Sequence, residues 1–153
     1  MLCNVKKLLV SSVTAFTLFS GAAMAAVPDE AVAMGGIKPG DTLDQAKALW
    51  GEPTWQKGKK YNFPNGVLVE VQGSNRFIIE ELRCKSPKGP ATFNGLSIGS
   101  HEKDVSKLYG PADKVKSEGM EVEYIYYSQD RKKKMTIETF YDSVISIECE
   151  LID

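Results

Sequence analysis

The feature that most constrains the fold of this chain is a segment that occurs twice at a constant spacing. The first copy, GGIKPGDTLDQAKALWGEP, begins at Gly35, and the second, NGLSIGSHEKDVSKLYGPA, begins at Asn94. Gly40 of the first copy aligns with Gly99 of the second, and apolar residues align with apolar residues at the same offset. A constant offset of this kind predicts that the chain contains two units of similar structure.

Each copy predicts a short amphipathic helix that ends abruptly. In the first copy, Ala46, Leu49 and Trp50 share one helical face, and Thr42 with Gln45 has the spacing of a capping box. The second copy has the same stripe and a serine as its expected cap, at Val105, Leu108, Tyr109 and Ser100. A glycine followed by a proline is typical of a helix C-terminus and ends both segments, at Gly51, Pro53, Gly110 and Pro111.

Three strands are expected after each helix. The apolar and polar residues predict strands at 60–63, 67–71 and 76–84 in the first copy and at 121–127, 133–141 and 144–152 in the second. Asn65-Gly66 is typical of a hairpin turn. Alternation assigns Ile145 and Ile147 to the face that meets the helix, and Glu80 interrupts the alternation, which predicts a bulge.

These elements predict an α+β fold. Two tandem repeats, 35–86 and 92–153, would each consist of a helix and a three-stranded antiparallel meander, and together they would form one sheet with the helices on one face. The other face of the sheet would then meet solvent.

The first 25 residues have the composition of a signal peptide. Lys6 and Lys7 precede a short apolar run, and small residues at Ala23 and Ala25 match the cleavage pattern, so we expect cleavage between Ala25 and Ala26. The protein would be exported, to the periplasm or outside the cell. No stable membrane insertion is expected after cleavage, because no later segment of the sequence is long and apolar enough to span a bilayer.

The repeated pattern resembles the β-lactamase-inhibitor-protein-like (BLIP-like) fold, which also occurs in envelope proteins of the SmpA/OmlA (BamE-like) type. The residues that carry the resemblance are Ile37, Gly40, Leu49, Gly51, Pro53, Leu96, Gly99, Leu108, Gly110 and Pro111. The resemblance implies a curved sheet whose concave face grips a globular protein. It covers 35–153, and its matching residues are structural positions, so it informs the fold more than the function.

The residues offer a candidate binding face and no catalytic signature. The alternation of side chains along the strands places aromatic and charged residues on the sheet face away from the helices. The candidate site on this face is Tyr127, Phe140, Glu138, Glu148, Glu81 and Arg83. Nearly equal numbers of basic and acidic residues, 19 and 20, do not favour nucleic-acid binding. We expect no metal and no cofactor, because the sequence has a single histidine and no cluster of Cys and His.

Two cysteines remain after the leader, Cys84 and Cys149. One alternative is a disulfide that ties the two final strands together, and the other is two buried free thiols packed as small apolar residues.

The sequence therefore predicts an exported, non-enzymatic protein-binding module whose open sheet face meets another envelope or extracellular protein, in the manner of an inhibitor. A structural or assembly protein of the cell envelope, similar to the SmpA/OmlA proteins, is the alternative. A hydrolase that uses His101 as a base is a third hypothesis.

Overall fold

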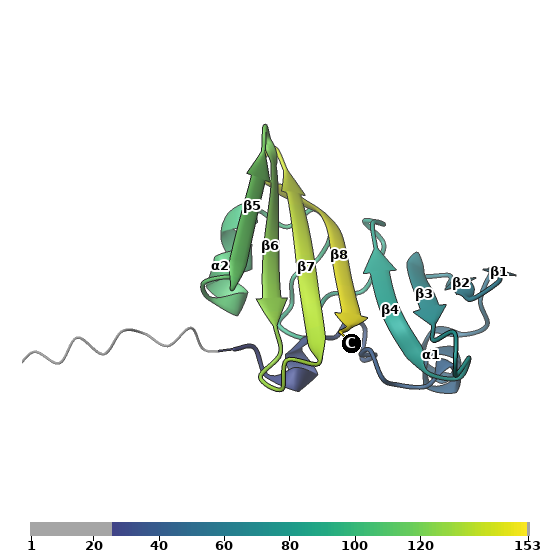
Figure 1. Ribbon diagram of the computed structural model, residues 1–153. Helices are drawn as coiled ribbons and strands as arrows, with labels where there is room; N and C mark the ends of the chain where they lie inside the picture. The colour runs from purple at the N-terminus through teal and green to yellow at the C-terminus, as the bar shows by residue number, and fades with distance from the viewer. Residues whose placement is uncertain (1–25, 153) are drawn as a thin grey trace, which may run out of the picture.

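The computed structural model describes residues 26–152, and the expected signal peptide therefore lies outside the described residues. One antiparallel sheet of eight strands dominates the fold (Figure 1), with the strand order β1-β2-β3-β4-β8-β7-β6-β5. The strands are β1 (Trp55–Lys57), β2 (Lys60–Asn62), β3 (Val67–Val71), β4 (Ile79–Cys84), β5 (Lys114–Glu118), β6 (Glu121–Tyr127), β7 (Lys133–Phe140) and β8 (Ser143–Leu151). The helices are α1 (Leu43–Trp50), α2 (Glu102–Tyr109) and the short 3-10 helix η1 (Asp29–Ala31).

The expected fold class is wrong. Residues 26–152 form one eight-stranded antiparallel sheet with two α-helices of eight residues each, and they do not form two helix-plus-three-stranded-meander repeats. Two edge strands, β1 and β5, were missed because every residue in them is exposed. A strand without a buried face carries no apolar alternation, so the pattern that identified the other strands is missing there.

Both helices begin and end where local chemistry dictates. Thr42 and Gln45 form the expected capping box, since Thr42 accepts the Gln45 N–H and the Gln45 side chain accepts the Thr42 N–H. The predicted cap of α2 is wrong: His101 is the N-cap, and its Nδ1 accepts the Lys103 N–H at 3.1 Å. The Ser100 hydroxyl instead accepts the Ser97 N–H in the preceding turn.

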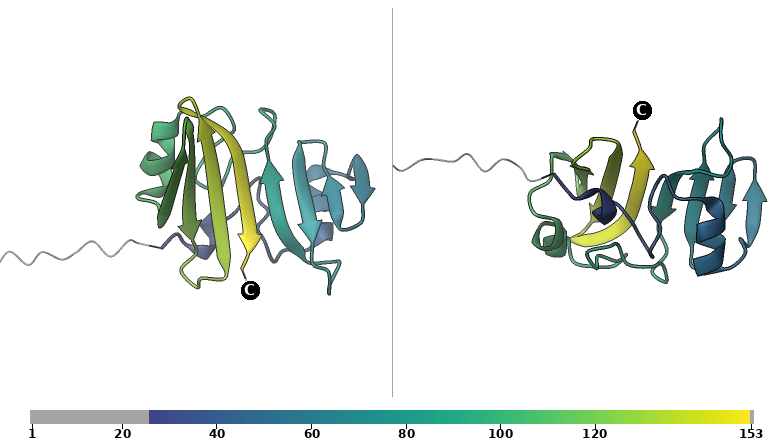
Figure 2. Two further views of the ribbon diagram at one scale, coloured as in Figure 1. Left: turned by 45° about the horizontal axis from the view of Figure 1, so that its top comes forward. Right: turned by 90° about the horizontal axis from the view of Figure 1, so that it is seen from below.

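One face of the sheet carries the hydrophobic core. Figures 1 and 2 show α1 and α2 on the same side of the sheet, together with the segment that contains η1. Leu43 and Ala46 of α1 pack into the same cluster as Val105 and Tyr109 of α2. The segment between Val27 and Ile37 contributes further buried side chains, so part of the core comes from a stretch without strand or α-helix.

Two bulges shift the alternation of the strands. Glu81 pairs with Glu70 and Ile79 pairs with Val71, so Glu80 is the extra residue, as predicted. A second, unpredicted bulge lies in β8 and leaves Ile145 without a partner on β7. The predicted placement of Ile145 on the buried face is therefore wrong, and its side chain is exposed.

Candidate functional site

The face of the sheet opposite the helices is uncovered (Figure 1). The strand register places all six predicted binding residues on this face. The reason is strand alternation, since each of these residues stands beside one that points into the core. For example, Glu148 lies between Ile147 and Cys149, which are both buried. The six residues are Glu81, Arg83, Glu148, Glu138, Tyr127 and Phe140, and the structure distributes them over three separate regions of this face.

The middle of the face is a network of ion pairs across β4 and β8. Arg83 Nε donates to Glu148 Oε2 at 2.7 Å, and a terminal nitrogen of the same guanidinium lies 2.9 Å from Glu81 Oε1. Lys134 on β7 forms an ion pair with Glu150 on β8. Each charged group of the network therefore pairs with an opposite charge, either on a neighbouring strand or on its own strand.

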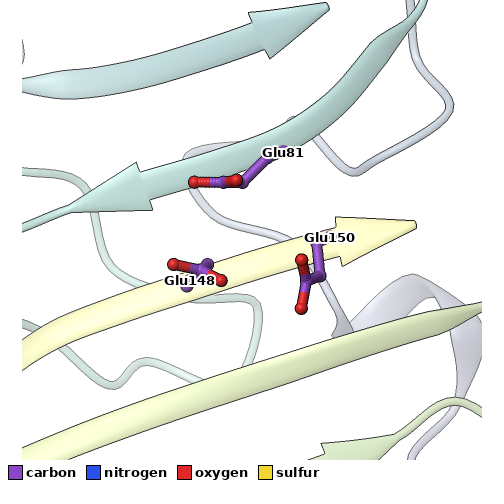
Figure 3. Close-up of side chains that lie close together, drawn as sticks. All are labelled: Glu81, Glu148 and Glu150. Atoms are coloured by element: carbon purple, nitrogen blue, oxygen red, sulfur yellow. The ribbon is translucent and has the colours of Figure 1, made fainter. Parts of the chain in front are cut away.

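Three carboxylates of this network converge (Figure 3). Glu81, Glu148 and Glu150 each place an oxygen within 4.8 Å of the others. Burial, together with the negative charge of Glu148, raises the pKa of Glu81 above its usual value. Carboxylate oxygens are the ligands that hard divalent cations prefer, and these three residues could supply them. Arg83 already forms ion pairs with Glu81 and Glu148, and Lys134 with Glu150, so each carboxylate has a cationic partner and we assign no metal to this cluster.

Tyr127 lies at one end of the open face and is partly covered. The guanidinium of Arg131 lies over its ring, 5.2 Å from the ring centroid. Its backbone N–H donates to Asp113 Oδ2 at 2.8 Å. Arg131 begins the basic run 131–134. This run forms an ion pair within the same chain, with Lys133 Nζ 3.9 Å from Asp130 Oδ2.

Phe140 lies at the other end of β6 and β7. It pairs with Glu121, which is six residues from Tyr127 on β6, so the two aromatic residues are ~20 Å apart along the strand. They do not form one apolar patch. Phe140 is 41% exposed and packs edge-on against Tyr141, with ring centroids 4.7 Å apart.

We call this end of the open face the apex; it comprises the β5–β6 and β7–β8 turns and the last residues of their strands. Tyr141 and Asp142 form the β7–β8 turn with φ of 47° and 62°, a left-handed conformation that is uncommon for a bulky residue such as tyrosine. The apolar side chains exposed at the apex are Met120, Phe140, Tyr141 and Ile145.

A shallow hollow of about 380 Å³ lies beside these apolar residues. Two rows of side chains cross the strands there. In the strand register, Lys116, Glu123 and Glu138 form one row, and Glu118 and Glu121 form the other. Lys116 forms an ion pair with Glu123. The other three carboxylates, Glu118, Glu121 and Glu138, have no ion-pair partner within residues 26–152. The hollow is therefore negatively charged, in contrast to the compensated middle of the face.

Sequence reasoning located Phe140 and Glu138 but missed the rest of the apex. Met120 and Tyr141 lie in turns, and Ile145 reaches the open face only through the bulge in β8. Gly119 before Met120 is a usable signal, since glycine at the first position of a two-residue turn is typical of a hairpin. The Tyr141-Asp142 turn has no glycine or asparagine, and the sequence contains no comparable signal for it.

Cys84 and Cys149 are free, buried thiols in the structure. They face the core from neighbouring strands but are offset by one step of the alternation, because Cys149 pairs with Leu82 while Cys84 pairs with Ile147. Diagonal neighbours of this kind lie ~7–8 Å apart, whereas the Cα atoms of a disulfide usually lie ~4.4–6.8 Å apart. Burial raises the pKa of both thiols, which keeps them protonated and unreactive.

His101 serves the helix that it begins. Its Nδ1 is occupied by the Lys103 N–H, and its backbone forms a bridge to Ser143. The side chain is exposed to solvent. Its observed contacts are those of a helix cap.

Within residues 26–152, no helix is long and apolar enough to cross a membrane. No family model matches the chain, and no curated protein matches it.

Two solved structures are similar at a low level. A DUF4309 family protein, YjgB, from Bacillus subtilis subsp. subtilis str. 168 is 14% identical, with a TM-score of 0.47 over 72% of this chain and 78% of that protein. An extracellular protein containing a SCP domain, from Bacillus anthracis str. Ames, is 12% identical, with a TM-score of 0.46 over 73% of this chain and 43% of that protein. Neither is described as a β-lactamase inhibitor protein or an SmpA/OmlA protein.

Proposed function

We propose that this chain is an exported protein-binding module that binds another envelope or extracellular protein through the apex of its open sheet face. The observation that carries the proposal is the juxtaposition at the apex of exposed apolar side chains with a hollow whose carboxylates lack partners. In the middle of the face, ion pairs such as Arg83 with Glu148 already satisfy the charged groups.

The chemistry of the apex selects the kind of partner. Phe140 and Tyr141 expose aromatic area, and exposed aromatic residues are frequent anchors of protein interfaces. Glu121 and Glu138 would attract Lys or Arg on the partner, which favours correct encounter and orientation. The partner surface that fits is therefore apolar at its centre, with basic side chains on one side.

Export is part of the proposal and depends on the signal-peptide composition of 1–25. The extracellular description of the Bacillus anthracis protein is compatible with it. Binding without catalysis is also part of the proposal, and it rests on the apolar side chains and carboxylates that the apex exposes.

Site-specific photocrosslinking in the native host tests this function. A photoreactive phenylalanine analogue at Phe140 should give one predominant crosslinked protein, identifiable by mass spectrometry. The matched control is the same analogue at Leu68, which lies on the open face of β3 at the other side of the sheet. Reversal of charge by Glu138→Lys should abolish the crosslink formed from position 140. Equal crosslinking from both positions, or crosslinking that the charge reversal leaves intact, would refute binding through the apex.

A further inference from the structure

Strand β5 is an unpaired edge of the sheet (Figure 1). It pairs with β6 on one side, and within residues 26–152 no backbone group bonds to its other side. All five of its residues, from Lys114 to Glu118, are exposed, so neither the helices nor the loops cover it. The opposite edge of the sheet, β1, is shorter, with three residues. An exposed edge of this length is a template for pairing with another strand.

The β5–β6 turn determines which backbone groups of β5 point outward. Gly119 and Met120 form a two-residue turn that is closed by Glu118 and Glu121. The closing pair of such a turn exchanges hydrogen bonds, and the bonded pairs then alternate along the strands. The residues of β5 that bond to β6 are therefore 114, 116 and 118.

Val115 and Ser117 consequently direct their N–H and C=O groups outward. The continuation of β6 agrees with this alternation, because the Tyr127 N–H points to the β5 side and is taken by the Asp113 carboxylate beyond the end of the strand. The free edge thus offers two donors and two acceptors, spaced for an antiparallel partner.

The side chains of β5 favour one partner in particular. Lys114 and Lys116 precede Glu118, and all three lie on the open face. An antiparallel copy of the same strand presents the opposite order, so a two-fold axis through Lys116 places Lys114 opposite Glu118 of the second copy, twice. The same register pairs Val115 with Ser117 of the second copy, which matches all four outward groups.

We propose that the protein forms a symmetric dimer by antiparallel pairing of β5 with β5 of a second copy, which extends the sheet across both chains. The least favourable contact is between the two Lys116 side chains at the axis. Each of them is already in an ion pair with Glu123 of its own chain, which reduces their repulsion. An unrelated extended peptide would satisfy the backbone groups equally well but would lack the complementary order of charges.

A mixing experiment with charge variants tests the partner and the register together. Lys114→Glu and Glu118→Lys each place like charges opposite each other in a homodimer, so each variant alone should dimerise roughly tenfold more weakly than the wild type. An equimolar mixture of the two variants restores opposite charges at both positions and should form heterodimers of wild-type strength. Sedimentation velocity over a wide concentration range measures these equilibria. A wild type that stays monomeric up to near-millimolar concentration, or a mixture no stronger than its components, would overturn the proposal.

A proline variant tests the edge separately. Ser117→Pro removes an outward N–H and leaves the bonds between β5 and β6 in place, since proline is tolerated on edge strands where its nitrogen faces solvent. This variant should be monomeric while retaining the wild-type circular dichroism spectrum. Gln56→Pro puts the same change in β1, the other edge, and should dimerise as the wild type does. Dimerisation of a folded Ser117→Pro variant at wild-type strength would also refute pairing through β5.

Discussion

Arg83 Nε donates to Glu148 Oε2 at 2.7 Å, across the junction of β4 and β8. Within residues 26–152, this is the only strand pair that joins the β1–β4 part of the sheet to the β5–β8 part. Arg83→Met leaves Glu81, Glu148 and Glu150 close together with Lys134 as their remaining cation. We expect it to lower the free energy of unfolding by about 1–2 kcal/mol at pH 7, because half-buried carboxylates lose their partner.

Urea denaturation at pH 7 measures this loss. Addition of Glu148→Gln to Arg83→Met should recover part of the stability, because one of the repelling charges is then removed. Lys116→Met is the control, since it removes a single ion pair at the edge of the sheet and should cost about 0–1 kcal/mol. Equal effects of Arg83→Met and Lys116→Met would show that the central network contributes no more than an isolated surface pair.

Glu81 makes stability depend on pH. Burial, and then the charge of Glu148, raise the pKa of this carboxyl in the folded protein. A carboxyl with a raised folded pKa holds its proton more tightly in the folded than in the unfolded state, so its contribution to stability falls as the pH rises from the usual value toward the raised one. Glu81→Gln removes this penalty and should make the protein more stable than the wild type at pH 7.

The difference should disappear when the pH falls below about 4, where Glu81 of the wild type is protonated in both states. Thermal or urea unfolding of both proteins across this range measures it. Glu80→Gln removes the same charge from the neighbouring bulge and controls for the change in net charge. A constant difference between Glu81→Gln and the wild type at all pH values would contradict the assigned cause.

Gly89 is required because the Cys84 thiol occupies the space of a side chain. A Cβ added at Gly89 would lie 2.1 Å from Cys84 Sγ, whereas the nearest atom to one added at Gly73 would be Cδ of Lys59, 4.0 Å away. We expect Gly89→Ala to cost about 1–3 kcal/mol through overpacking and Gly73→Ala to cost much less. Cys84→Ala removes the sulfur, so Gly89→Ala should be less harmful in that background.

A double-mutant cycle by chemical denaturation measures the coupling between positions 84 and 89. The two substitutions together should destabilise the protein by less than the sum of their separate effects. Additive effects would show that the backbone near Ser86, whose carbonyl oxygen lies 3.0 Å from the added Cβ, rather than the thiol, excludes the alanine.

The sequence predicted those parts of the fold that have a buried side. The helix at Leu43–Trp50 was recognisable from its capping box and terminal glycine, and β3 and β6 have the expected bounds. Leu49 was assigned to the buried helix face and is 61% exposed, since α1 presents mainly Leu43 and Ala46 to the core. The edge strand β5 has no buried residue and could not be recognised from periodicity.

The sequence predicted which face of the sheet the candidate site residues occupy, but not which of them lie close together. Alternation alone determines that Phe140 and Tyr127 share the open face, but their separation depends on the register of β6 against β7. Ile145 depends on a bulge, and a bulge reverses the face of a residue without a marked change in composition. The ion pair of Arg83 with Glu148 depends on β4 and β8 being neighbours, which joins segments far apart in the chain.

Val27 links the expected processing of the chain to its stability. Its side chain is 4% exposed, its N–H donates to the Tyr127 carbonyl oxygen at 3.2 Å, and its carbonyl oxygen accepts the Gln129 N–H at 3.0 Å. Cleavage at the expected site, between Ala25 and Ala26, would leave these contacts in place, and N-terminal sequencing of the processed chain would then begin at Ala26. Val27→Asp buries a carboxylate in the core and should cost about 2 kcal/mol or more, measured by urea denaturation. Glu30→Asp, at an exposed position of the same segment, keeps the charge and should have little effect. A mature N-terminus beyond residue 27 with undiminished stability would show that this segment does not hold the end of β6.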